Sequence, residues 1–100
     1  MNQPMRNYEL VVVANAALDD EALTALNQRI AGWIGAGGGT VSNTNVWGRR
    51  QLAYAIGKHT AGIYVQFDFQ LAPSASRELE RSLRIEENIL RHLVVRPDEG

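Results

Sequence analysis

The segment VWGRRQLAYAIGKHTAGIYVQFDF, from Val46 to Phe69, predicts the centre of the fold, a pair of strands joined by a turn. From Ile63 to Leu71 apolar side chains alternate strictly with more polar ones, which is the period of a strand with one buried face. The preceding stretch, Thr40–Ile56, has the composition of a long, irregular strand, and Gly48 indicates a bulge or bend inside it. We expect the turn at Gly57–Gly62.

A strand and a helix flank this hairpin on each side along the chain. Upstream, Asn7–Ala14 is short, β-branched and apolar, which predicts a buried central strand. The acidic residues 19–21 favour a helix N-terminus, and the glycines at 37–39 stop that helix. Downstream, residues 72–85 predict a second helix, and residues 87–97 predict a strand that ends before the final proline of that range.

The order β-α-β-β-α-β predicts an α+β fold, a ferredoxin-like sandwich. Right-handed crossovers place both helices on one face of a four-stranded antiparallel sheet. The other face is then uncovered and available to a partner. We expect one such domain over residues 5–96, a flexible N-terminal extension over residues 1–4 and a frayed C-terminus over residues 97–100.

The composition excludes several classes of protein. The chain has 100 residues, no cysteine and a formal net charge of −1, so disulfide frameworks, thiolate zinc sites and cysteine nucleophiles are excluded. No apolar run is long enough to span a bilayer, and the first residues lack the apolar core of a signal peptide. We therefore expect a cytoplasmic protein that does not associate with membranes.

The sequence contains no clear signal for a catalytic or metal-binding site. His59 and His92 have no metal-ligand spacing, and no nucleophile elbow or paired-carboxylate motif occurs. The glycines at 37–39 follow a helix and precede a strand, whereas a phosphate-binding loop needs the reverse order. The loop after the first strand lacks the arginine that an acylphosphatase-like enzyme would need there. We expect no enzymatic activity, no cofactor, no metal and no small-molecule substrate.

The charges are segregated along the chain. Between Glu21 and Asp68 there is no carboxylate, yet Arg49, Arg50 and Lys58 lie in this interval. Arginine forks pair naturally with phosphate oxygens. We expect guanidinium groups that are distant in sequence to converge after folding into a basic cluster that acids do not neutralise. From the residues alone, phosphate binding and a protein-binding module both remain open.

The uncovered sheet face favours protein association over base stacking. Ferredoxin-like RNA-binding domains stack bases on aromatic side chains of the two central strands. Here the outward positions of the first strand are Glu9, Val11 and Val13, and Tyr64 is the only aromatic side chain that we expect to point outward from the strand after the turn. This face is more aliphatic than aromatic, which is typical of a protein-binding surface.

The stretch WGRRQLAYAIGKHTAGIYV closely resembles the bacterial small-subunit ribosomal protein six family. That family carries a Gly-basic-basic-polar-Leu-Ala-Tyr segment in its long second strand, which stands here at Gly48–Tyr54. The opening MRNYE, at Met5–Glu9, and the segment LRIEENILRHLVVR, at 83–96, are similar to the family's start and to its end. The resemblance covers residues 5–96 in order.

The resemblance implies a structural component of the bacterial small ribosomal subunit. Such a protein would bind small-subunit ribosomal RNA as a heterodimer with ribosomal protein eighteen. The basic residues that we expect to bind RNA are Arg6, Arg49, Arg50, Lys58, Arg84, Arg91 and Arg96. The residues that we expect to bind the protein partner are Glu9, Val11, Val13 and Tyr64. The alternative is a protein-only association or regulatory module that uses the open sheet face.

Overall fold

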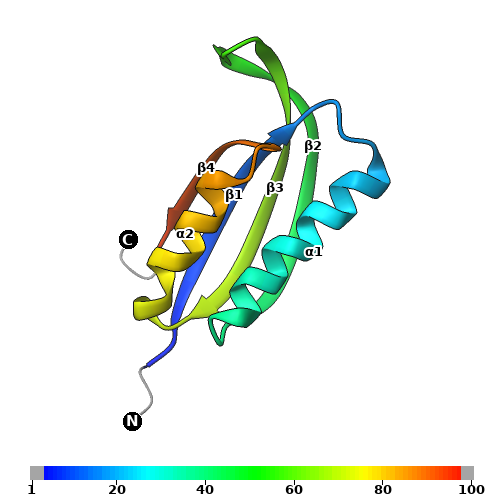
Figure 1. Cartoon of the computed structure of the whole chain (residues 1–100). Helices are drawn as coiled ribbons and strands as arrows, with labels where there is room; N and C mark the ends of the chain where they lie inside the picture. The colour runs from blue at the N-terminus through cyan, green and yellow to red at the C-terminus, as the bar shows by residue number, and fades with distance from the viewer. Residues whose placement is uncertain (1–3, 98–100) are drawn as a thin grey trace.

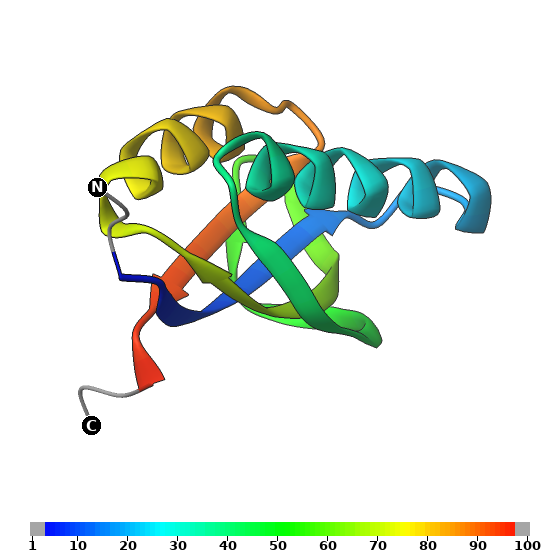
Figure 2. The ribbon, with the colours of Figure 1, turned by 90° about the horizontal axis from the view of Figure 1, so that it is seen from below.

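Strands and helices follow one another in the expected order in the computed structural model, which describes residues 4–97. The elements are β1 (Arg6–Asn15), α1 (Asp20–Ala36), β2 (Thr40–Ile56), β3 (His59–Leu71), the short 3-10 helix η1 (Pro73–Ala75), α2 (Ser76–Ile85) and β4 (Ile89–Val95). The strands form an antiparallel sheet in the order β2-β3-β1-β4, and both helices lie on the same side of it (Figures 1 and 2). The predicted ferredoxin-like sandwich is confirmed.

The chain ends fall mostly outside the part that the structure describes. The expected flexible extension at 1–4 and the expected frayed end at 97–100 include residues 1–3 and 98–100, which are not described. Those two predictions, and the domain bounds of 5–96 that depend on them, stay predictions.

The hairpin turn is tighter than its composition predicts. Strand pairing resumes at His59, opposite Ile56, so the predicted turn at Gly57–Gly62 is wrong beyond its first two residues. Gly57 has φ 58°, a left-handed conformation that glycine adopts without steric cost. Strand β1 ends opposite Gly62. The hairpin of β2 and β3 therefore continues beyond the end of β1 as a two-stranded ribbon, and its tip rises above the rest of the sheet (Figure 1).

Helix α1 begins and ends where its sequence predicts. The Asp19 carboxylate accepts a hydrogen bond from the backbone N–H of Ala22 at 2.8 Å, which caps the first turn. Asp20 and Glu21 follow in that turn, where the helix dipole favours negative charge. The backbone N–H of Gly37 closes the C-terminus on carbonyls of the last turn. The helix therefore presents a defined apolar face to the sheet.

The core lies between the helices and one face of the sheet. Alternate residues of β1 and β3 point into it and meet the apolar faces of α1 and α2, and the Tyr8 and Phe69 rings stack with their centroids 5.4 Å apart. The fully or nearly fully buried residues of this core are Tyr8, Leu10, Val12, Ala14, Leu23, Leu26, Ile30, Ile34, Ile63, Val65, Phe67, Phe69, Leu71, Leu79 and Leu83. Their burial on one side leaves the opposite sheet face without a covering layer.

An ion pair joins α1 to the residue that follows α2. The Arg29 Nη2 atom lies 2.8 Å from Oε1 of Glu86. Burial raises the pKa of Glu86, but the hydrogen bonds from Arg29 and from the Asn88 backbone, together with the Arg29 charge, outweigh this effect, so the net pKa lies below its usual value. The carboxylate is therefore ionised at neutral pH and fastens the second helix against the first.

A β-bulge interrupts β2 where the sequence predicts a bend. Val46 faces Val65 and Gly48 faces Tyr64, so Trp47 is an extra residue that has no opposite residue on β3. Gly48 has φ 106°, a backbone conformation that residues other than glycine rarely adopt. The extra residue resets the alternation of β2, so that Arg49 faces the helix side and Arg50 faces the uncovered side.

We predict opposite effects of two glycine-to-alanine changes. Gly48→Ala should lower the free energy of unfolding by about 1–3 kcal/mol, because alanine is strained at this φ although no atom stands in its way. Gly32→Ala, at an exposed position inside α1 with open space around it, should raise the free energy of unfolding by roughly 0.5–1 kcal/mol. Urea denaturation measures both, and a Gly48→Ala protein as stable as the wild type would show that the bulge conformation is not required.

Candidate nucleic-acid interface

The open face, by which we mean the sheet face away from the helices, changes character along the strands. The register places Glu9 of β1 between Asp68 of β3 and Val95 of β4. Further along β1, Val13 lies between Tyr64 of β3 and Arg91 of β4. Side chains directly opposite each other on neighbouring strands point to the same face of the sheet. One end of the open face is therefore acidic, and the other end is basic and aromatic.

At the basic end, an indole, a phenol ring and a guanidinium group gather on the open face. The rings of Trp47 and Tyr64 are parallel within 2°, with centroids 6.1 Å apart. The Cζ atom of Arg50 lies 5.4 Å from the Trp47 centroid and 6.0 Å from the Tyr64 centroid. These distances are typical of cation–π contacts. We call Trp47, Tyr64 and Arg50 the aromatic–arginine stack.

The bulge positions Trp47 in this stack. Gly48 faces Tyr64 across the strands but has no side chain to place on the open face. The Trp47 indole stacks beside Tyr64 instead and keeps 39% of its surface exposed. The alternation of the sequence did not identify Trp47, although the glycine that follows it was a signal that the alternation breaks there.

Gly62, two residues before Tyr64 on β3, makes room for the Val13 side chain beside the stack. A methyl group added at Gly62 would collide with the Val13 side chain. Val13 fills this space and is only 6% exposed, whereas Glu9, Val11 and Tyr64 are partly exposed. Of the predicted partner-binding residues, Val13 therefore offers little surface to a partner and mainly supports its neighbours.

At the acidic end, two carboxylates stand beside exposed apolar side chains. The Asp68 carboxylate accepts hydrogen bonds from the side-chain amides of Gln66 at 3.1 Å and Asn43 at 3.4 Å, which are neutral donors, and Glu9 lies directly opposite on β1. Leu93, which faces Val11, is 60% exposed, and Val95, which faces Glu9, is 40% exposed. The combination suits an apolar partner surface with basic neighbours.

The predicted arginines do not form one cluster. Arg50 and Arg91 lie at the basic end of the open face, and Lys58 lies in the turn at the tip of the hairpin. Arg6, by contrast, lies at the start of β1, seven residues or about 23 Å from the position opposite Arg91. Arg84 is exposed in the last turn of α2, on the helix side. The expectation of a single basic cluster is therefore wrong.

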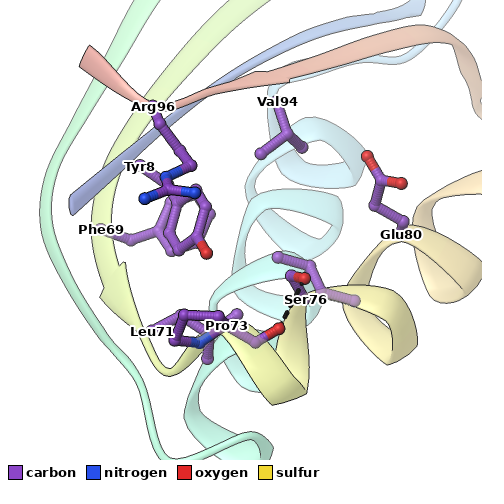
Figure 3. Close-up of a pocket in the computed structure, with 9 residues that line it drawn as sticks. Tyr8, Phe69, Leu71, Pro73, Ser76, Glu80, Val94 and Arg96 are labelled. Atoms are coloured by element: carbon purple, nitrogen blue, oxygen red, sulfur yellow. Dashed lines mark hydrogen bonds between the residues drawn. The ribbon is translucent and has the colours of Figure 1, made fainter. Parts of the chain in front are cut away.

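Arg96 lines a hollow on the helix side of the sheet. The hollow has a volume of about 290 Å³, and Figure 3 shows the Arg96 side chain turned towards Tyr8 across it. Next to it, the Ser76 hydroxyl donates a hydrogen bond to the Pro73 carbonyl at 2.8 Å (Figure 3). The residues that line the hollow are Tyr8, Phe69, Leu71, Pro73, Ser76, Leu79, Glu80, Val94 and Arg96. Arg96 is therefore separated from the open face by the sheet itself.

Arg49 is occupied by the protein's own backbone. Its Nε atom donates to the Ala16 carbonyl at 3.1 Å and its Nη2 atom donates to the Leu18 carbonyl at 2.6 Å. These hydrogen bonds tie β2 to the loop between β1 and α1, across the intervening strand β3. Whether Arg49 also binds RNA stays a prediction, but its guanidinium already has a structural role.

Neither a metal centre nor a membrane helix occurs in the described residues. No group of three or more His, Asp or Glu side chains within residues 4–97 is placed to hold a metal ion. None of the helices in that range combines the length and the apolar character needed to cross a bilayer. His59 and His92 lie apart, at the start of β3 and in the middle of β4.

The fold defines a ferredoxin-like α+β domain, with one sheet face packed under helices and the other uncovered. Comparison with known proteins gives the family. The sequence model of the family Ribosomal protein S6 matches residues 7–96, and the chain belongs to this family. The predicted family resemblance is confirmed.

Relatives and a solved structure agree with this assignment over nearly the whole chain. The chain is 44% identical over 94 residues to small ribosomal subunit protein bS6 of Salinispora arenicola, which covers 94% of this chain and 98% of the relative. It is 43% identical to bS6 of Clostridium novyi, over 95% of this chain and all of the relative. The crystal structure of 30S ribosomal protein S6 from Thermotoga maritima superposes with a TM-score of 0.89 at 25% identity, covering 96% of this chain and 91% of that one.

Family membership confirms several of the predictions made from the sequence. The protein is a structural component of the small ribosomal subunit, and not an enzyme. It is therefore located on the ribosome, in the cytoplasm. The open face with its two chemically different ends is the surface on which its contacts are to be sought.

We predict that the two adjacent arginines contribute differently to stability. Arg49→Ala should lower the free energy of unfolding by about 1–3 kcal/mol, because the Ala16 and Leu18 carbonyls lose a charged donor. Arg50→Ala should lower it by less than about 1 kcal/mol, since an exposed cation–π contact contributes little. Urea denaturation of both variants at one salt concentration measures the difference, and equal losses would contradict the structural role of Arg49.

Proposed function

We propose that the protein binds small-subunit ribosomal RNA as a heterodimer with ribosomal protein eighteen (S18), and that the two ends of the open face divide this work. The basic and aromatic end meets RNA, and the acidic and apolar end meets S18. The observation that supports this proposal most is the separation of charge along the open face, where Arg50 and Arg91 lie at one end and Glu9 and Asp68 at the other.

The basic end is far enough from the acidic end to act on its own. Tyr64 and Asp68 are four residues apart on β3, which is about 13 Å in an extended strand. Exposed charges are screened over roughly 8 Å at physiological ionic strength. Arg50 and Arg91 are both exposed, and among the described residues neither forms an ion pair with a carboxylate. Both remain available to phosphate oxygens.

Lys58 extends the RNA surface along the hairpin. It lies in the turn between β2 and β3, beyond the end of β1, and its side chain is exposed. Such a lysine serves as a mobile point charge for a phosphate more than as a rigid fork. Arg6, Arg84 and Arg96 would add contacts only where the RNA also reaches the helix side or the far end of the sheet. For Arg49 we propose a positioning role, because it holds the strand that carries Arg50.

The acidic end suits a basic partner protein. The exposed side chains of Leu93 and Val95 offer apolar surface along the outermost strand, and Glu9 and Asp68 supply negative charge beside it. A chain of net charge −1 makes few phosphate contacts by itself. A basic partner bound at this end would supply the remaining electrostatic attraction to RNA, which explains why a heterodimer would bind better than either protein alone.

A salt titration tests the RNA surface. The double variant Arg50→Ala/Arg91→Ala, bound to S18, should have a weaker affinity for small-subunit ribosomal RNA. The negative slope of log affinity against log salt should become shallower, by roughly 0.7–0.9 for each lost phosphate contact. The matched control is Arg77→Ala/Arg81→Ala, which removes the same charge from exposed positions of α2. If both double variants bind with equal affinity and slope, the RNA surface lies elsewhere.

Calorimetry without RNA tests the protein surface. Leu93→Asp should weaken binding of S18 by at least about ten-fold, because it places a charge beside the apolar side chains of Val11 and Val95 on the open face. Ile85→Asp is the matched control, since Ile85 is 74% exposed but lies on the helix side. An unchanged affinity of the Leu93→Asp protein would contradict this interface. Tight binding of S18 to the wild type, with no RNA binding by the complex, would instead favour the protein-only association module.

A further inference from the structure

We propose that the aromatic–arginine stack is the binding site for one unpaired nucleotide of the RNA, whose base stacks on the group formed by Trp47, Tyr64 and Arg50. This inference rests on the proposed RNA binding and adds the part of the RNA that the open face contacts. It also revises the expectation that this face is too poor in aromatic side chains to stack a base, because that expectation did not include Trp47.

The three groups of the stack contact one another within the protein. The two rings are parallel within 2°, and the Arg50 guanidinium lies over both at similar distances, 5.4 and 6.0 Å. The Gly48 bulge holds Trp47 at this position, and the supporting side chain of Val13 is buried beside Tyr64. A site whose groups are already in place binds its ligand without the cost of ordering them.

The chemistry of the stack fits both parts of a nucleotide. Bases stack on aromatic rings and on guanidinium planes, and this stacking tolerates any base because every base has a π-face. The phosphate of the same nucleotide, or of its neighbour, needs a cationic donor. Arg50 provides one in the stack, and Arg91 provides another on β4, two strands away from Tyr64, at about 10 Å between these two main chains.

Charge decides between RNA and a protein as the occupant. Tryptophan, tyrosine and arginine also dominate the contacts at the centres of protein interfaces. Here, however, the stack is flanked by Arg91 and followed along the hairpin by Lys58, and the carboxylates of the open face lie at its other end. An anionic ligand with a planar group matches this surface. Because A-form duplex RNA keeps its bases paired, the nucleotide must come from a loop, a bulge or a single strand.

The fluorescence of Trp47 provides a direct test. The chain has two tryptophans, and Trp33 lies in α1 against the core, so Trp33→Phe leaves Trp47 as the single reporter on the open face. The complex of this variant with S18 is titrated with small-subunit ribosomal RNA. We expect saturable quenching of Trp47 as the base stacks on it, at the same RNA concentration that saturates binding. Quenching by S18 alone, with none on adding RNA, would overturn the proposal and assign the stack to the protein partner.

Affinity measurements separate stacking from charge. Trp47→Leu should weaken RNA binding by the S18 complex by about five-fold to a hundred-fold and leave the salt slope unchanged, because stacking on one base is lost while every phosphate contact stays. Trp47→Phe should recover part of this loss, since a smaller ring still stacks. Thermal unfolding of both variants checks that they fold, and the partly recovering Trp47→Phe protein keeps the test valid if Trp47→Leu is unstable.

The outcomes distinguish this inference from the proposed function. If the wild-type complex binds RNA, and Trp47→Leu binds it equally well without any quenching in the Trp33→Phe protein, the nucleotide site is wrong and the RNA-binding surface stands. If the wild-type complex does not bind RNA at all, both proposals fail together. A loss of affinity on Trp47→Leu that comes with a reduced salt slope would show displaced phosphate contacts, and would also overturn the stacking site.

Discussion

The arrangement of the open face depends on a single extra residue in β2. Alternation along a strand has a period of two, so one inserted residue reverses the face of every side chain after it. Without the bulge at Gly48, Arg49 would point away from the loop that it holds and Arg50 would point towards the helices. The bulge thus assigns one arginine of an adjacent pair to hydrogen bonds with the protein's own backbone and the other to the open face, a difference that composition alone does not show.

The two faces of the sheet are built by different rules. On the helix side, the side chains are buried and pack to fill the core, and the stacked pair Tyr8 and Phe69 closes the end of the core away from the hairpin. On the open side, a second aromatic pair, Trp47 and Tyr64, remains partly exposed, and the Arg50 guanidinium lies over both rings. The same kind of ring contact therefore stabilises the core on one side and prepares a contact surface on the other.

Much of the fold could be predicted from the sequence, because its signals are local. The alternation in Ile63–Leu71 defines a strand with one buried face, and the Asp19 cap with the glycines after α1 defines a helix. The tight turn was missed because Gly62 looks like a turn residue, whereas it lies in β3 and makes room for Val13. Signals of this kind depend on a neighbour in space, and the sequence does not display that neighbour.

The site was harder to predict than the fold for the same reason. The interval without carboxylates is a feature of the sequence and says nothing of how far apart its charges lie in space. In the folded sheet, the length of β1 separates Arg6 from the position opposite Arg91. Backbone carbonyls accept the hydrogen bonds of Arg49, and carbonyls of this kind leave no trace in residue identity. Trp47 escaped notice because a bulge residue belongs to neither set of alternating positions.

The ribbon beyond the end of β1 has a consequence for how the molecule meets a large particle. Water reaches both of its faces, Tyr54 is 81% exposed, and no third strand restrains it. An isolated two-stranded ribbon is only marginally stable, so this tip is free to bend and fray while the rest of the sheet stays closed. The tip could therefore dock in several geometries, but docking would cost the conformational entropy that the ribbon loses when it is ordered. The rigid part of the sheet would determine where the protein sits, and the ribbon would adapt to whatever surface lies nearby.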